Sequence, residues 1–129
     1  MITTSDVANI IYRDCAVFGI EIVPDGKTIK GKLTSDRVVI HVHKEQPGTY
    51  WNKCFVEVNL CVPDAGRDDG DTVRLTELER SAKNLLRGSG WYDDSFYRYD
   101  ISSIGRDRDS SLECYFINCK LLFEVLNVR

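Results

Sequence analysis

Alternation of apolar and polar residues predicts the strands of this chain. Residues 54–62 and 36–45 alternate most clearly, and residues 95–104 and 111–126 predict two later strands joined by the polar turn "GRDRDS". Two short extended pieces are expected around a Pro-Asp-Gly turn signal at residues 24–26. The apolar positions that share one face of their strands are Val38, Ile40, Val42, Val56, Val58, Leu60, Val62, Tyr115, Ile117, Cys119, Leu121, Phe123 and Val125.

Apolar residues at helical spacing predict two helices. Thr4 or Ser5 is expected to cap the first helix, and Asp71 or Thr72 the second, with Gly88 placed to close it. The apolar stripes are Val7, Ile10, Ile11, Cys15 and Phe18 in the first helix, and Leu75, Leu78, Ala82, Leu85 and Leu86 in the second.

The order of these elements predicts an α+β fold in a single domain that spans residues 1–129. Consecutive strands joined by short turns pair antiparallel. We therefore expect an antiparallel sheet of strands of mixed length, with two helices packed on one face and the order α-β-β-β-β-α-β-β.

Composition changes this picture little. The chain is 43% apolar and 29% charged with a formal net charge of -3, so the whole chain does not predict nucleic-acid binding. No apolar run approaches the ~18 residues of a membrane helix, and the N-terminus lacks the features of a signal peptide. An odd number of cysteines, several within strands, indicates a reducing, cytoplasmic environment. These cysteines are Cys15, Cys54, Cys61, Cys114 and Cys119.

Two histidines are the first candidates for chemistry. His41 and His43 point to the same side of a predicted strand, and Cys61 or Glu57 on a neighbouring strand is a conceivable third metal ligand. No Cys-x-x-Cys or His-x-x-x-His spacing supports this site. We therefore expect polar residues on an exposed strand face and no metal, and keep a metal-dependent enzyme as the weakest alternative.

Other catalytic or cation-binding patterns are also lacking. A cysteine nucleophile needs a base, and the only histidines lie on the strand just described. The acidic loop at residues 64–71 does not fit an EF-hand, because aligning Gly70 with the required glycine places Ala65 and Arg67 at ligand positions. The favoured interpretation of this loop is a solvated turn followed by a helix cap. We expect no enzyme activity and no cofactor.

Aromatic residues gather in two places that favour protein contacts. Tyr50 and Trp51 lie at an expected hairpin tip, and Trp91 and Tyr92 follow a Gly-Ser-Gly break. Tyrosine and tryptophan are enriched at protein interfaces, although some of these rings are needed to cover the sheet. We treat these four residues as candidate interface residues.

The succession of elements and one strand motif resemble the small tail-terminator (tail-completion) proteins of long-tailed bacteriophages and prophages. Members often carry a strand reading like "nVNIyvPD" before an acidic loop and a helix. Here the matching positions lie in "VEVNLCVPD", and the likeness in element order extends over nearly the whole chain. The matching residues are Val58, Asn59, Leu60, Val62, Pro63 and Asp64.

This resemblance implies a structural, non-catalytic role. Such proteins form a ring, commonly of six subunits, that ends polymerisation of the tail-tube protein and joins the tail to the head–tail connector protein. The protein would be cytoplasmic during assembly and then part of the virion tail, without contact with a membrane. DNA would pass through the ring without specific binding, because family lumens are usually acidic. The residues expected to face the lumen are Asp64, Asp68, Asp69 and Asp71.

Two questions stay open at this point. The aromatic segment at residues 91–99 and the cysteines are not family signatures, so the subunit contact is assigned from general rules to a strand edge plus the tip at residues 46–51. The alternative function is a small-ligand or regulatory binding module with a cystatin-like or NTF2-like helix-on-sheet fold. That alternative predicts a concave apolar pocket lined by side chains such as Phe116 or Phe123.

Overall fold

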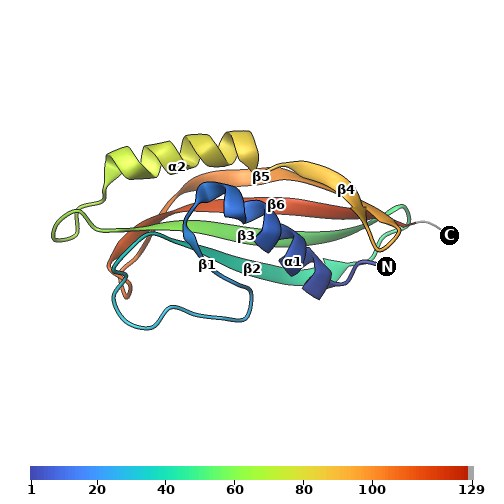
Figure 1. Cartoon of the computed structure of the whole chain (residues 1–129), viewed down its shortest axis with the longest axis horizontal. Helices are drawn as coiled ribbons and strands as arrows, with labels where there is room; N and C mark the ends of the chain where they lie inside the picture. The colour runs from blue at the N-terminus through green and yellow to red at the C-terminus, as the bar shows by residue number, and fades with distance from the viewer. Residues whose placement is uncertain (128–129) are drawn as a thin grey trace.

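The computed structural model describes residues 1–127 and contains two α-helices and one six-stranded sheet (Figure 1). The α+β class is confirmed, but the expected order is wrong, because three strands rather than four precede the second helix. The elements in chain order are α1 (Thr4–Cys15), the 3-10 turn η1 (Ala16–Phe18), β1 (Glu21–Val23), β2 (Arg37–Gln46), β3 (Trp51–Pro63), α2 (Thr72–Leu85), β4 (Gly88–Tyr92), β5 (Ser95–Asp109) and β6 (Cys114–Leu126).

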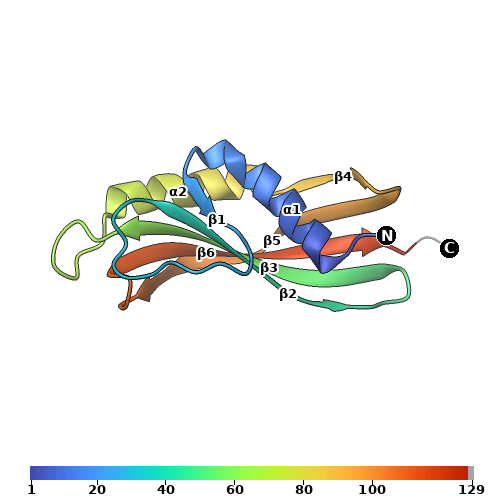
Figure 2. The same cartoon turned by 60° about the horizontal axis from the view of Figure 1, so that its bottom comes forward.

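The sheet has the strand order β1-β2-β3-β6-β5-β4. Every neighbouring pair is antiparallel except β1 and β2, which run parallel, so the expectation of a purely antiparallel sheet is wrong. The second extended piece expected at residues 27–33 forms no strand. Residues 24–36 instead form a long connection that crosses the sheet on the side away from the helices (Figure 2).

Helix α1 begins with a capping box. The side chain of Thr3 accepts a hydrogen bond from the N–H of Asp6, and the Asp6 carboxylate accepts one from the N–H of Thr3. The expected caps at Thr4 and Ser5 are therefore wrong by one or two positions. In α2 the cap at Asp71 is confirmed, since its carboxylate accepts the N–H of Arg74 at 3.1 Å.

Strand β4 occupies a stretch in which the sequence predicts a break. Gly88 does not close α2, which is capped at Leu86, but pairs with Tyr99 across β4 and β5. Gly90 pairs with Tyr97 in the same way. A Cβ atom at either glycine would lie 3.1 Å from a tyrosine ring atom or hydroxyl, so the missing side chains make room for these rings.

Strand β5 also runs further than expected. The predicted turn "GRDRDS" is almost entirely strand, because β5 continues to Asp109 and pairs with β6 as far as Cys114. The chain reverses at residues 110–113 instead. Likewise, β3 begins at Trp51, three residues before the expected start.

Both helices lie on the same face of the sheet, which we call the helix-side face (Figures 1 and 2). The main core lies between the helices and this face. The opposite face, which we call the open face, is covered at one end by the connection at residues 24–36. There Leu33 is buried against Cys61 and Cys114, and its N–H bonds the carbonyl of Leu112. Within residues 1–127, no helix combines the length and apolar character that crossing a membrane requires.

Candidate functional site

An aromatic row crosses the open face at the end of the sheet away from Leu33. Trp51 on β3 lies opposite Leu126 on β6, and Trp91 on β4 lies opposite Phe96 on β5. The ring of Phe96 lies between the two indoles, with centroids 6.4 Å from Trp51 and 5.5 Å from Trp91. We call Trp51, Leu126, Phe96 and Trp91 the aromatic row. Trp91 is 69% exposed, which is unusual for so large an apolar side chain and favours a contact role.

Arg98 holds one end of this row in place. Its guanidinium carbon lies 3.9 Å from the centroid of the Trp51 ring, within range of a cation–π interaction. Its Nε also donates to Oε1 of Glu124 at 3.2 Å. Because Arg98 is bound on two sides, Trp51 is presented in a fixed orientation rather than as a loose side chain.

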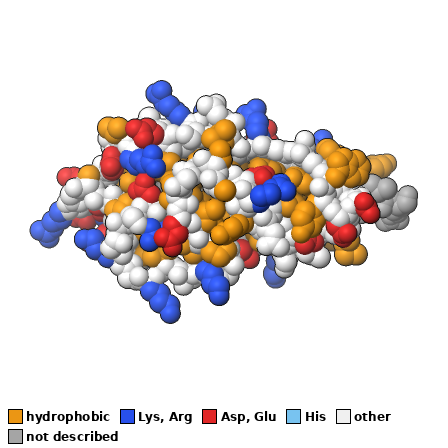
Figure 3. All heavy atoms as spheres, viewed as in Figure 1, with side chains coloured by type: hydrophobic (Ala, Val, Ile, Leu, Met, Phe, Trp, Pro, Cys, Tyr) orange, Lys and Arg blue, Asp and Glu red, His pale blue; other side chains and the backbone are white. Residues whose placement is uncertain are grey.

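The hairpin tip beside the row is tied to the end of β6. Tyr50 is 75% exposed, and its carbonyl accepts the N–H of Asn127 at 2.7 Å. Figure 3 shows hydrophobic side chains gathered at the end of the molecule with the β4–β5 turn, while charged side chains surround the start of α2 at the other end. This view shows the helix-side face, so these hydrophobic side chains lie at the same end as the aromatic row but on the other face of the sheet.

The four candidate interface residues do not form one patch. Trp51 and Trp91 are brought together through Phe96, and Tyr50 lies beside them at the tip. Tyr92 points to the helix-side face and packs against the main core. Arg98 was missed, and Phe96 was noted only as part of the aromatic segment at residues 91–99, although the alternation in residues 95–104 places the two on one face.

The acidic loop is partly neutralised by an arginine from β5. Nη2 of Arg108 lies 2.9 Å from Oδ2 of Asp64 and 3.2 Å from Oδ1 of Asp68. The guanidinium also lies over the ring of Tyr115, 4.8 Å from its centroid. Only 9% of the Asp64 side chain is exposed, so its charge interacts mainly with Arg108 and little with solvent.

The remaining aspartates of the loop have different surroundings. Asp71 caps α2, and the carbonyl of Asp69 accepts the N–H of Ala65 at 2.8 Å, which closes a small turn. The side chain of Asp68 is 81% exposed, and Asp69 is also exposed. The negative charge that this loop presents to solvent therefore comes mainly from Asp68 and Asp69.

The two histidines lie together on the open face. Their ring centroids are 4.5 Å apart, and Nε2 of His43 lies 2.8 Å from Oε2 of Glu57. The other oxygen of Glu57 accepts a hydrogen bond from Asn118. The bond from His43 lowers the pKa of Glu57 below its ordinary value. Cys61 lies apart from this group, and residues 1–127 contain no set of three or more His, Cys, Asp or Glu residues arranged to hold a metal.

The cysteines are thiols in apolar surroundings. Burial raises the pKa of Cys15, Cys61 and Cys119 to about 12. Burial also raises the pKa of Cys54 and Cys114 to about 11. All five are therefore protonated at neutral pH, and they pack as small hydrophobic side chains.

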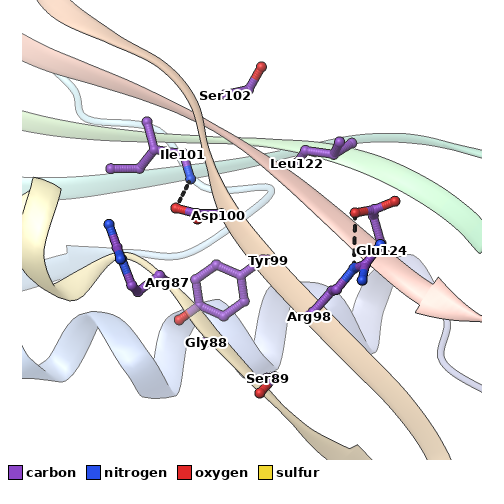
Figure 4. A pocket seen from close by; sticks show the side chains of 10 residues that line it. All are labelled: Arg87, Gly88, Ser89, Arg98, Tyr99, Asp100, Ile101, Ser102, Leu122 and Glu124. Carbon is purple, nitrogen blue, oxygen red and sulfur yellow. Dashed lines mark hydrogen bonds and ion pairs between the residues drawn. The ribbon is translucent and has the colours of Figure 1, made fainter.

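A groove lies where β4 leaves the edge of β5 (Figure 4). It has a volume of about 570 Å³, within the range of small-molecule sites. Leu122 and Ile101 give it apolar lining, and Arg87, Arg98 and Glu124 bring charges to its walls. The pair formed by Arg98 and Glu124 is visible in Figure 4, so part of this charge is already neutralised.

The two phenylalanines of the alternative ligand site do not share a pocket. Phe123 is fully buried in the main core, where its ring stacks on those of Tyr97 and Tyr99 with centroids 5.2 Å and 5.7 Å away. Phe116 packs on the opposite face with Leu33 and its neighbours.

None of the protein-family models matches the chain, and none of the curated proteins matches it.

Proposed function

We propose that this chain is a structural virion assembly protein of the tail-terminator kind, which binds other proteins and transforms no molecule. Copies of it form a ring on the end of the tail tube, stop addition of the tail-tube protein, and present a surface to the head–tail connector protein. The aromatic row is the observation that carries the proposal.

The aromatic row has the properties of a protein contact. Large aromatic side chains at a protein interface contribute much of the binding free energy, and they do so best when their orientation is fixed beforehand. Trp91 is exposed, and Trp51 is held by Arg98, so both can be buried by a partner without rearrangement. Scattered single hydrophobic residues on a surface need no such explanation, but a row of four across four strands does.

The tail-terminator part of the proposal comes from the resemblance of residues 56–64 and of the element order. In a ring, the acidic loop next to this strand would present the exposed side chains of Asp68 and Asp69 to passing DNA. Arg108 pairs with Asp68 as well as with Asp64, but only the Asp64 side chain is largely buried. Repulsion between these carboxylates and phosphates would act over about 10 Å at physiological salt.

A capping experiment tests the proposal. A tail-tube protein from the genome that encodes this chain is allowed to polymerise alone or with the purified chain, and tube lengths are measured by negative-stain electron microscopy. We expect the wild-type chain to shorten the tubes and to appear as a ring at one end. Tubes of unchanged length without terminal rings would overturn the proposal.

A pair of variants assigns this activity to the aromatic row. Trp91→Glu places a charge in the row without disturbing the core, and we expect it to lose capping. Val73→Glu makes the same kind of change at a side chain of α2 that is 70% exposed, far from the row in the fold, and should cap normally. Equal capping by both variants would show that the row is not the contact.

A small-ligand binding module is the second candidate, and the groove beside β4 is the observation that favours it. Thermal unfolding in the presence of a library of small molecules would detect a ligand by a rise in midpoint. Leu122→Trp fills the groove and is expected to abolish such a rise, whereas a rise that persists in this variant would place the ligand elsewhere.

A further inference from the structure

Besides the outer sides of the edge strands β1 and β4, the sheet has two stretches of strand edge without a neighbouring strand in the described part of the chain. β4 pairs with β5 only as far as Tyr99, which leaves the β5 edge, residues 100–109, with β6 on one side alone. β1 pairs with β2 only as far as Val39, which leaves the β2 edge, residues 40–46. Unpaired edges are ready-made surfaces for strand pairing with another chain.

Along these edges, aspartate side chains of the chain itself accept hydrogen bonds from backbone N–H groups. Oδ1 of Asp100 accepts the N–H of Ile101 at 2.7 Å, and Oδ1 of Asp107 accepts the N–H of Arg108 at 2.9 Å. On β2, Asp25 accepts the N–H of Val42 at 2.8 Å. A strand that pairs with either edge must displace these carboxylates, so they oppose indiscriminate association while the chain is free.

The charges of the β5 edge oppose pairing with itself. Arg106 and Arg108 lie opposite Ile117 and Tyr115 in β6, which places both on the helix-side face, and Asp107 then points to the open face. When two β5 edges pair antiparallel about a two-fold axis, the helix-side faces of the two copies lie on the same side of the joined sheet. When the axis passes through Asp107, arginine would then face arginine and aspartate would face aspartate, which is destabilising.

The β2 edge has the complementary arrangement. His43 lies on the open face, where it contacts Glu57, and Glu45 lies opposite Cys54 and therefore on the helix-side face. A bulge between Val42 and Glu45 sets the spacing of these two side chains. The open face of the β2 edge thus presents an imidazole where that of the β5 edge presents Asp107. On the helix-side face, the β2 edge presents the acidic Glu45 where the β5 edge presents arginine.

Strand directions allow the two edges to meet. β2 is antiparallel to β3, β3 to β6, and β6 to β5, so β2 and β5 run in opposite directions. Two copies in the same orientation therefore place the β2 edge of one antiparallel to the β5 edge of the next. Contact between residues 43 and 107 also requires a displacement along the strands, because within one copy Asp107 lies level with Arg37 across the sheet. This is a head-to-tail contact, in which one copy keeps its β5 edge and the other keeps its β2 edge for a further neighbour.

We infer that copies of this chain associate by pairing the β2 edge of one with the β5 edge of the next, with His43 opposite Asp107 and Glu45 opposite Arg106. On pairing, the N–H of Arg108 donates to a carbonyl of the incoming strand instead of to Asp107. The carboxylate of Asp107 then contacts His43. The inference rests on the proposed function, in which copies form a ring, and it names the contact between them.

Cross-linking tests the register. His43→Cys and Asp107→Cys proteins are mixed, oxidised, and analysed on non-reducing gels, and the linked peptides are identified by mass spectrometry. The five native cysteines are buried, so the new thiols react first. We expect the mixture to give a disulfide between positions 43 and 107, far above a control mixture of Val73→Cys with Asp107→Cys. Equal yields in both mixtures would overturn the inference.

A charge exchange tests the second pair. Glu45→Arg and Arg106→Glu are each expected to reduce cross-linking between positions 43 and 107 several-fold, and the two changes together in one chain should restore it. A double variant no better than the single variants would remove this pair from the contact. Circular dichroism confirms that each variant is folded before it is compared.

The capping experiment separates this inference from the proposed function. Terminal rings formed by the wild-type chain, without a cross-link between positions 43 and 107, would leave the function standing and overturn the contact. The cross-link without any effect on tail tubes would support the contact and overturn the tail-terminator role. Absence of both results would overturn both.

Discussion

The hydroxyl of Tyr99 on β5 donates a hydrogen bond to Oδ2 of Asp14 on α1, with 2.6 Å between the oxygens. Next to it, Nη2 of Arg13 donates to the hydroxyl of Tyr97 at 2.9 Å. Burial, followed by the bond to Asp14, raises the pKa of Tyr99 above its ordinary value. Two tyrosines thus fasten the first helix to the strand that carries one of the free edges.

Replacing Tyr99 with phenylalanine should destabilise the fold. The ring and its stacking on Phe123 are kept, but a hydrogen bond to a charged group is lost, which costs about 1.5–3 kcal/mol. Urea denaturation measures the loss. Tyr12→Phe, at a side chain that is 47% exposed, is the matched control and should leave the free energy of unfolding unchanged.

Alanine at Gly90 should also reduce stability. Its Cβ would lie 3.1 Å from the hydroxyl of Tyr97, so the ring must shift within a packed core at a cost of about 1–3 kcal/mol. Gly105→Ala is the control, because a Cβ there meets nothing within 4 Å. If both variants unfold at the same urea concentration, close packing against β4 is not what requires glycine.

Glycine at Asp94 is expected to stabilise the protein. Asp93 and Asp94 form the two-residue turn between β4 and β5, with φ values of 48° and 60° that suit glycine better than aspartate. Relief of this strain, less the added entropy of the unfolded chain, amounts to about 0.5–1 kcal/mol. Asp94→Ala keeps the strain and should give no gain in the same thermal unfolding measurement.

Stability should depend on pH through Glu57. The bond from His43 lowers the pKa of this carboxyl in the folded protein below the ordinary value of 4.5 that holds in the unfolded chain. Its contribution is therefore present above pH 4.5 and is lost as the pH falls through the lower, folded value. Comparison of thermal midpoints for wild type and Glu57→Gln should show a difference that shrinks in acid.

The cause of this pH dependence can be tested separately. In a His43→Gln background, the difference between glutamate and glutamine at position 57 should be smaller and should change less with pH, because the main contact of the carboxylate is altered. An unchanged profile in this background would mean that Asn118, rather than His43, sets the behaviour of Glu57.

Local patterns in the sequence predict a good part of this fold. The alternation of Val56, Val58 and Leu60 places them correctly in the core, and Asp71 is correctly identified as a cap. These features depend on neighbours in sequence, where periodicity and capping preferences act directly.

The remaining features depend on partners that are distant in sequence. Gly88 and Gly90 favour a break on propensity alone, and they form a strand only because Tyr99 and Tyr97 fill the space beside them. Gly105 and the charges after it indicate a turn, yet pairing with β6 extends β5 through them.

The candidate site also combines features that local sequence predicts with features that depend on distant partners. Residue type and position identify Trp51 and Trp91 as interface candidates, since tryptophan is enriched at interfaces and the two follow an expected hairpin tip and a Gly-Ser-Gly break. Their connection through Phe96 requires the strand order β3-β6-β5-β4, which no local pattern specifies.

The connection at residues 24–36 gives the molecule three layers at one end, with Leu33 and the buried thiols of Cys61 and Cys114 beneath the sheet and the helices above it. At the other end, where Trp51 and Trp91 lie, the sheet has only one covering layer. The face that carries Trp51 and Trp91 is therefore left accessible to a partner, whereas the same face is already occupied by the chain itself at the Leu33 end.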